Sequence, residues 1–133
     1  MAPMIYTLKR GVDPKDLGMI QPALWILLTR TFLYCAEYEL PCRITSLIND
    51  RKGVKATSRT HESGRAVDIS VRGWSNTHKY RFQYIMNQAY SDIAAISASD
   101  HKPRAVVLHD SGRGPHLHIQ VRPNAKWHKF IKE

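Results

Sequence analysis

Histidine and aspartate side chains with the chemistry of metal ligands occur in two short stretches of the chain. His61 and Asp68 lie in the first stretch, and His116 and His118 lie in the second. A catalytic zinc ion takes three protein ligands of these types and leaves a fourth position for water. His61, Asp68 and His118 would supply such a set. Two readings without a metal stay open: a hydrogen-bonded His–Asp pair, and histidines on the surface of an edge strand.

The hydrophobic pattern indicates that strands position these side chains. Residues 67–71 alternate apolar and polar, so a strand here turns Asp68 away from its apolar face. Residues 116–121 alternate in the same way, which places His116 and His118 together on the polar face. An aspartate on a strand beside a core is costly to bury without a partner, and a metal ion is one such partner.

The remaining pattern predicts the other elements of a small α+β domain. A buried helix begins at Pro22 and ends before Pro41, and a second helix capped by Asn76 or Thr77 runs to about Tyr90. Two more strands are expected, at residues 43–48 and 104–109, and a polar loop is expected at residues 49–66. We expect a mainly antiparallel sheet with two helices on one face and a zinc cleft on the other.

Two motifs together resemble a known group of enzymes. Residues 61–68 read H-x-x-G-x-A-x-D, and residues 116–118 read H-x-H. In this order the motifs resemble the zinc peptidases grouped with lysostaphin, the D-alanyl-D-alanine metallopeptidases and the hedgehog signalling domain. The nearest branch is the D-alanyl-D-alanine carboxypeptidase-like one, which includes phage endolysins, and the resemblance spans about residues 40–122. It implies that His61, Asp68 and His118 bind Zn2+.

The resemblance also implies a reaction, the hydrolysis of a peptide bond in peptidoglycan stem peptides. The bond could be that of an L-alanyl-D-glutamate endopeptidase or of a D-alanyl-D-alanine carboxypeptidase. Such hydrolysis needs a base beside the metal. Many members of the branch place an acidic residue three positions before the last ligand, where this chain has Pro115. The first histidine of the H-x-H motif has a comparable role in other branches of the group, so we expect His116 to be the base or a transition-state stabiliser, with Asp110 and His109 as second choices.

Four arginines lie close in sequence to these motifs: Arg43, Arg51, Arg59 and Arg65. A guanidinium group can hold a carboxylate through two parallel hydrogen bonds. We expect one of the four to bind a substrate carboxylate, and the sequence does not choose among them. Arg59 also stands where members of the group often carry a serine two positions before the first ligand, while Ser58 lies one step farther back.

The charge distribution indicates an anionic partner. The 133 residues include 20 Lys+Arg and 11 Asp+Glu, a formal charge of +9, and residues 51–133 carry the whole excess. A cell wall, a nucleic acid or an acidic membrane would suit this charge. The sequence lacks a zinc-finger or stacked-aromatic signature, so nucleic-acid binding is a minor alternative. A zinc-binding module of the same fold without catalysis is another.

Length and hydropathy predict the number of domains and the location of the protein. A chain of 133 residues suits one compact unit, so we expect residues 1–133 to form a single catalytic domain that acts as a monomer. The longest strictly apolar run, residues 23–28, predicts no membrane span, and no signal peptide is visible. We expect a cytoplasmic product that reaches the cell wall with the help of a holin-like protein. Cys35 and Cys42 are expected to be buried thiols.

Overall fold

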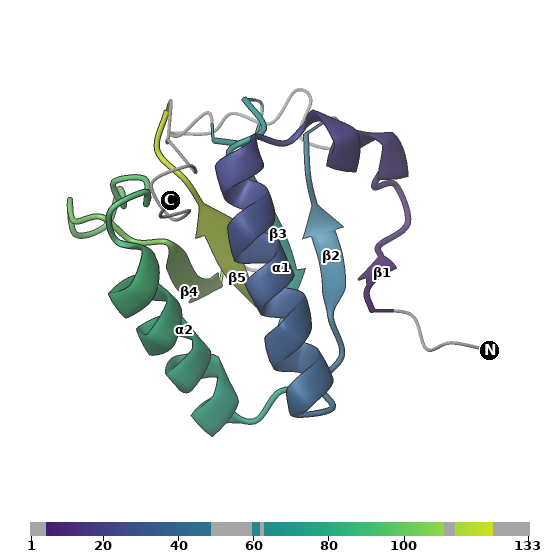
Figure 1. Ribbon diagram of the computed structural model, residues 1–133. Coiled ribbons are helices and arrows are strands. Elements are labelled where there is room, and N and C mark those ends of the chain that lie inside the picture. The colour runs from purple at the N-terminus through teal and green to yellow at the C-terminus, as the bar shows by residue number, and fades with distance from the viewer. Residues whose placement is uncertain (1–4, 49–59, 62, 111–113, 124–133) are drawn as a thin grey trace, which may run out of the picture.

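The fold is a five-stranded sheet with two long helices. The computed structural model describes residues 5–48, 60–61, 63–110 and 114–123 (Figure 1). Along the chain the elements are β1 (Thr7–Leu8), the 3-10 helix η1 (Pro14–Met19), α1 (Pro22–Glu37), β2 (Arg43–Ser46), β3 (Ala66–Ser70), α2 (Asn76–Tyr90), β4 (Val106–Asp110) and β5 (Pro115–Gln120). The strand order is β1-β2-β3-β5-β4. Only the pairing of β1 with β2 is parallel, which confirms the predicted α+β class with a mainly antiparallel sheet.

The predicted elements are present, with small differences at their ends. α1 begins with Pro22 in its first turn, as expected, and the chain leaves it at Glu39, which has a positive φ of 54°. The predicted cap of the second helix was wrong, because Ser75 is the N-cap and its hydroxyl accepts a hydrogen bond from the His78 backbone N–H. The short β1 and η1 lie in a segment whose sequence has no clear period, and they were not predicted.

The helices and the sheet enclose the core. In Figure 1 both helices lie in front of the strands. The sheet residues that face them are apolar and buried, and so are the inward residues of both helices: Leu24, Leu27, Leu28, Val67, Ile69, Phe82, Met86, Leu117 and Ile119. Burial of this apolar surface is the main favourable term in folding. Because side chains alternate along a strand, the intervening residues of β3 and β5 lie on the opposite face of the sheet.

α2 also closes the edge of the sheet at β4. The side-chain amide of Asn87 donates to the carbonyl of Val106 and accepts from its N–H, at 2.8 and 2.9 Å. Gln83 accepts from the Leu108 N–H at 2.7 Å. These contacts satisfy backbone groups that an edge strand would otherwise present to solvent. They fix β4, and with it His109, relative to the rest of the sheet.

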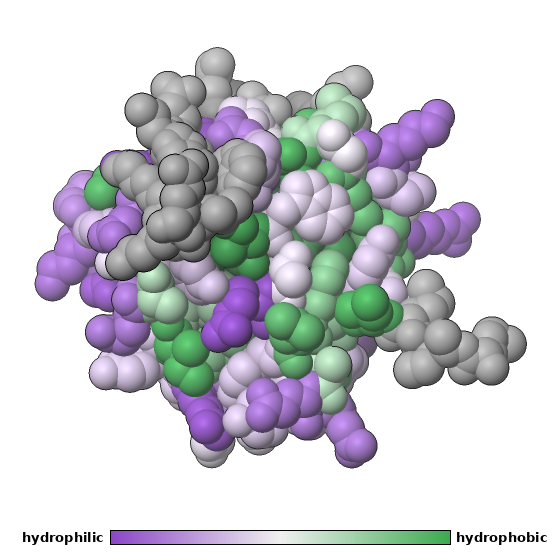
Figure 2. Space-filling model, in the orientation of Figure 1, coloured by the Kyte–Doolittle hydropathy of each residue, from purple (hydrophilic) through white to green (hydrophobic). Residues whose placement is uncertain are grey.

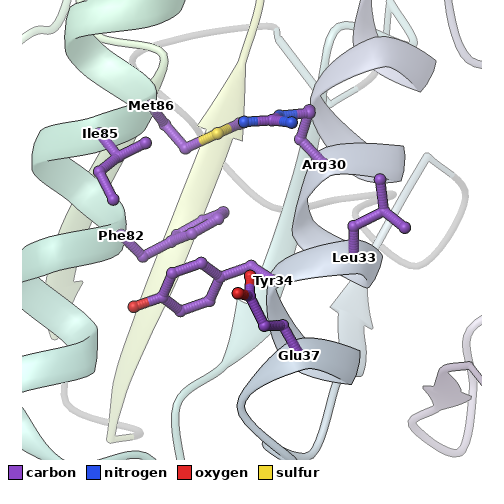
Figure 3. A pocket seen from close by; sticks show the side chains of 7 residues that line it. All are labelled: Arg30, Leu33, Tyr34, Glu37, Phe82, Ile85 and Met86. Carbon is purple, nitrogen blue, oxygen red and sulfur yellow. The ribbon is translucent and has the colours of Figure 1, made fainter.

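On the helix side, the described residues form a mixed apolar and polar surface (Figure 2). Figure 2 shows separate apolar patches on this side, interrupted by polar side chains. A small cavity of about 80 Å³ lies between α1 and α2, and Figure 3 shows Arg30, Tyr34 and Met86 among its lining side chains. It is on the opposite side of the sheet from Asp68 and His118. Cys35 and Cys42 are free and buried, as predicted.

Within the described part of the chain, no helix is both long enough and apolar enough to cross a membrane. The longest helix, α1, has 16 residues and carries Arg30 and Glu37. A bilayer crossing needs about 20 apolar residues.

Candidate metal centre

Asp68 lies at the centre of a cluster of histidines on the face of the sheet opposite the helices. Its Oδ1 atom is 2.8 Å from Nδ1 of His118 and 3.3 Å from Nε2 of His61. One nitrogen or oxygen atom from each of the three side chains lies within 4.8 Å of the others, so the group could hold a metal ion. The structure thus brings together the three residues that the motifs predict as ligands.

Strand pairing accounts for two of the three positions. Asp68 and His118 are direct partners in the antiparallel ladder between β3 and β5. Side chains of directly opposed residues have Cβ atoms about 5 Å apart on one face of the sheet. The flanking residues Val67, Ile69 and Leu117 are fully buried on the helix side. A slip of the register by one residue would expose this apolar set, so the core itself holds Asp68 and His118 opposite each other.

His61 reaches the cluster from a tight turn that precedes β3. The Gly64 N–H donates to the His61 carbonyl at 3.1 Å, and Gly64 has a positive φ of 70°. A Cβ at this position would lie 2.7 Å from the Met19 carbonyl oxygen, and the Gly64 carbonyl accepts from the Gln21 N–H. Only glycine fits both the backbone conformation and this close approach. The glycine of the first motif therefore serves to seat His61 against the start of α1.

Both imidazole rings have their outer nitrogen occupied by a group that can only accept a hydrogen bond. Nδ1 of His61 donates to the Leu47 carbonyl at 2.9 Å. Nε2 of His118 is 2.9 Å from Oε1 of Gln120 and donates to it. In the neutral ring the proton sits on that outer nitrogen, so the inner nitrogen presents a lone pair. Two lone pairs and a carboxylate oxygen then face one another, and only a cation, either a proton or a metal ion, relieves this arrangement.

The electrostatics of Asp68 favour the charged form of its carboxyl group. Burial alone would raise its pKa, since the residue is only 5% exposed. When the rings of His118 and His61 are protonated, their hydrogen bonds and positive charge outweigh burial and hold the pKa of Asp68 well below its usual range. A buried, ionised carboxylate beside two imidazole nitrogens is a ligand set suited to a divalent transition metal.

His116 and His109 lie beside the cluster on the same face. Nε2 of His116 is 3.9 Å from Oδ2 of Asp68, and its side chain is partly exposed. His109 is the cross-strand partner of His116, and their rings meet edge to face with centroids 4.2 Å apart. Burial, and then the charge of His116, lower the pKa of His109. His116 is thus the nearer of the two to the three ligands.

The third candidate for the base, Asp110, is placed differently. Asp110 ends β4, and strand alternation puts it on the face opposite to His109. Its Oδ1 atom accepts a hydrogen bond from the Gly114 N–H at 3.1 Å, which links the two ends of the β4–β5 turn. Asp110 thus lies on the other face of β4 from His109 and contacts the start of β5.

The structure separates the two candidate arginines that it describes. Arg43 is exposed, and it pairs with Ser70 on the face that carries Asp68. Arg65 is engaged elsewhere, because its Nε donates to the Ser63 hydroxyl at 2.9 Å and its Nη1 to the Val121 carbonyl at 3.2 Å. Burial lowers the pKa of Arg65. Arg51 and Arg59, like Ser58, lie outside the described residues.

Two further residues on this face were missed by the sequence analysis. An irregularity in β2 places Ser46 opposite Asp68, where its buried hydroxyl has no hydrogen-bond partner among the described residues. Bulges of this kind often re-aim a side chain beside a functional site. Gln120, the partner of His118, shares its strand face at a spacing of two residues. Strand alternation could have predicted that Gln120 shares a face with His118. No pattern in the sequence predicts the bulge that places Ser46.

Comparison with known proteins gives no family assignment: no protein-family model, no curated protein and no solved structure matches the chain. The interpretation of the cluster therefore depends on its own residues and geometry.

Proposed function

We propose that the chain is a zinc-dependent peptidase that hydrolyses a peptide bond in peptidoglycan stem peptides. The carrying observation is the cluster of His61, Asp68 and His118, with an ionised carboxylate and two inward ring nitrogens. Two histidines and one carboxylate form a donor set typical of catalytic zinc, which needs only three protein ligands. The two motifs that resemble the lysostaphin and D-alanyl-D-alanine metallopeptidase group support the choice of metal and substrate.

When bound, zinc supplies a Lewis acid that lowers the pKa of water towards about 7 and polarises a peptide carbonyl. The residues of this chain supply proton transfer. His116 takes the proton of the attacking water and returns it to the leaving amine, because its Nε2 atom lies 3.9 Å from Oδ2 of the ligand Asp68 on an accessible edge of the cluster. His109 packs against the ring of His116 and orients it.

Arg43 is our candidate for holding the substrate. A row of side chains crosses the sheet from Arg43 on β2 through Ser70 on β3 to His116 on β5. Stem peptides carry carboxylate groups, which a guanidinium can bind through two hydrogen bonds. An exposed cation at one end of the row and the proton-transfer group beside the ligands would together orient such a peptide. The bond cut, L-alanyl-D-glutamate or D-alanyl-D-alanine, decides which carboxylate is held.

Replacement of Arg43 by glutamine tests this role. We expect the KM for a muropeptide to rise about 10-fold or more while zinc content is unchanged, because one charge-assisted contact to the substrate is lost. Arg72→Gln is a suitable control, since Arg72 is an exposed arginine just beyond the end of β3. Equal KM values for wild type and Arg43→Gln would remove Arg43 from the proposal.

The net positive charge of the protein would attract it to the anionic cell wall, which carries its proposed substrate. The net charge of +9 would increase its local concentration at such a surface. In this proposal a holin-like partner gives the protein access to the wall from the cytoplasm.

The central experiment measures metal content and wall lysis together. We expect the purified protein to bind one zinc ion, and a chelator to abolish both the metal and the lysis of purified peptidoglycan. His61→Ala should do the same, whereas His101→Asn should not, because His101 is an exposed histidine whose positive φ asparagine tolerates. Mass spectrometry of the digested muropeptides then identifies the bond. Lysis that survives both the chelator and His61→Ala would refute the proposal.

A further inference from the structure

Gln120 is a buried polar residue with a specific place beside the metal ligands. It ends β5, two residues after His118, and strand alternation puts both side chains on the same face. Only 4% of Gln120 is exposed. Burial of a carboxamide is costly unless its donors and its acceptor are all satisfied.

Two backbone carbonyls determine which way the carboxamide of Gln120 points. Its Nε2 group donates to the carbonyls of Arg104 and Ala95, at 3.0 and 3.3 Å. Those two residues are themselves joined, because the Arg104 N–H donates to the Ala95 carbonyl at 3.0 Å. A flipped carboxamide would direct its oxygen at two carbonyl oxygens. The orientation with Oε1 towards His118 is therefore the only one that satisfies every group.

This orientation determines which nitrogen of His118 carries the proton. Oε1 of Gln120 is an acceptor, and it lies 2.9 Å from Nε2 of His118. Nε2 must therefore be protonated, which leaves Nδ1 to face Oδ1 of Asp68 at 2.8 Å. Without Gln120, the neutral ring would gain more by placing its proton on Nδ1 and donating it to the carboxylate. That tautomer has no lone pair on Nδ1 to offer a metal ion.

The use of Nδ1 also fits the spacing of the strands. His118 is directly opposite Asp68 in the ladder, and Nδ1 is the ring nitrogen closer to the backbone. His61 reaches in from a turn and offers the more distant Nε2. The outer nitrogen of His61 is held by the backbone carbonyl of Leu47, whereas that of His118 is held by a side chain.

We propose that Gln120 is a positioning residue that keeps the proton of His118 on Nε2 and so makes Nδ1 the metal ligand. The part of this inference that concerns metal binding rests on the proposed function. The position of the His118 proton can be measured in the metal-free protein as well. Partners of this kind around ligating histidines are typically worth a factor of about 10–100 in metal affinity.

Two substitutions separate this role from a purely structural one. Gln120→Leu removes the acceptor for His118 and the two donors to the loop carbonyls. Gln120→Glu retains an acceptor for the His118 N–H and removes the amide donors. We expect Gln120→Leu to weaken zinc binding about 10–100-fold in a competition titration, and Gln120→Glu to stay within a few-fold of wild type. Thermal unfolding of each metal-free variant reports whether the loop contacts matter for stability.

Equal loss of zinc affinity in both variants would overturn the proposal, because Gln120 would then act only as an anchor for the loop. Imidazole ¹⁵N shifts of the metal-free wild type provide a measurement that needs no variant. At a pH above the range in which histidine titrates, we expect the His118 proton on Nε2. A proton on Nδ1 would overturn the proposal. A wild type that keeps the proton on Nε2 and yet binds no zinc would refute the proposed function while leaving the role of Gln120 intact.

Discussion

At the scale of single residues, the candidate centre depends on where protons sit. Asp68 is ionised, and the outer nitrogens of His61 and His118 each donate to an acceptor, so three electron-rich atoms converge. In a hydrogen-bonded His–Asp pair without a metal the inner nitrogen would carry the proton, so the position of this proton separates the two interpretations. His116 lies beside these three atoms and is not one of the proposed metal ligands.

His116→Ala should separate proton transfer from metal binding. We expect zinc content to remain at one ion per chain, since His116 is not among the three ligands. The kcat for muropeptide hydrolysis should fall by about 10²–10⁴-fold, the usual contribution of a general acid–base group. The measurement is kcat alongside metal analysis of the same sample. Unchanged turnover would move the proton-transfer role to His109, and zinc binding with no turnover in the wild type would favour the non-catalytic module.

Acid should destabilise the metal-free protein through Asp68. The pKa of this carboxyl group is lower in the folded state than its usual value, so its ionised form stabilises the fold above the unfolded pKa of about 3.9. That stability is lost as pH falls through the unfolded pKa towards the folded one. Denaturant unfolding of wild type and Asp68→Asn across this range should therefore show a stability difference that shrinks with acid. A difference independent of pH would contradict the assignment of the shift to Asp68.

At the scale of elements, the ladder between β3 and β5 and the turn before β3 position the three candidate ligands. The ladder sets Asp68 opposite His118, and the turn brings in His61 through Gly64. α2 contributes indirectly, because Asn87 and Gln83 hold β4, on which His109 lies. Ligands on paired strands are held more rigidly than ligands on separate loops, which suits a centre that must keep a fixed geometry.

Gly64→Ala should damage the turn that carries His61. An alanine here would combine a positive φ of 70° with a Cβ placed 2.7 Å from the Met19 carbonyl oxygen. We expect a loss of about 1–3 kcal/mol in the free energy of unfolding and weaker zinc binding. Gly11→Ala is the matched control, since Gly11 has a positive φ of 96° but nothing within 4 Å of an added Cβ. If chemical denaturation finds equal losses for the two variants, the close approach to Met19 has no role.

At the scale of the whole molecule, the sheet separates an apolar face from a polar one. One face carries the apolar core and both helices, and the other carries the histidine cluster with Arg43 at its edge. The cavity between the helices is on the core side and is small, at about 80 Å³, so it offers no room for a peptide near the ligands. Under the proposed function, the substrate would bind on the face that carries the histidine cluster, and the net charge of +9 would attach the protein to the wall.

Salt should weaken wall lysis more than peptide cleavage. Attachment of a protein with a net charge of +9 to an anionic wall is screened over about 10 Å at 0.1 M ionic strength. Cleavage of a short soluble muropeptide depends on local contacts and is screened less. Turbidity loss of purified walls and peptide hydrolysis should be followed over the same salt series. Equal salt sensitivity would contradict charge-based attachment, and tight binding to DNA at low salt would favour the nucleic-acid alternative.

The sequence by itself determined the strands that matter and the faces on which their side chains lie. Alternation in residues 67–71 and 116–121 is a local property, so it predicted that Asp68, His116 and His118 turn away from the core. The two motifs predicted the partnership of His61, Asp68 and His118, which the structure brings together. The start of the first helix was predicted correctly at Pro22, whereas α1 ends at Glu37, several residues before Pro41.

Only the tertiary structure shows which other side chains lie near the cluster and what they contact. Arg43 and Arg65 are equally basic in sequence, but strand pairing puts Arg43 on the site face while Ser63 and Val121 engage Arg65. Asp110 and Gln120 differ in the same way, since Asp110 accepts a hydrogen bond from the Gly114 N–H while Gln120 contacts His118. These assignments depend on ladder register, on a bulge in β2 and on contacts with backbone carbonyls far apart in sequence. Such contacts arise only when the strands pair, so no local pattern of residue types records them.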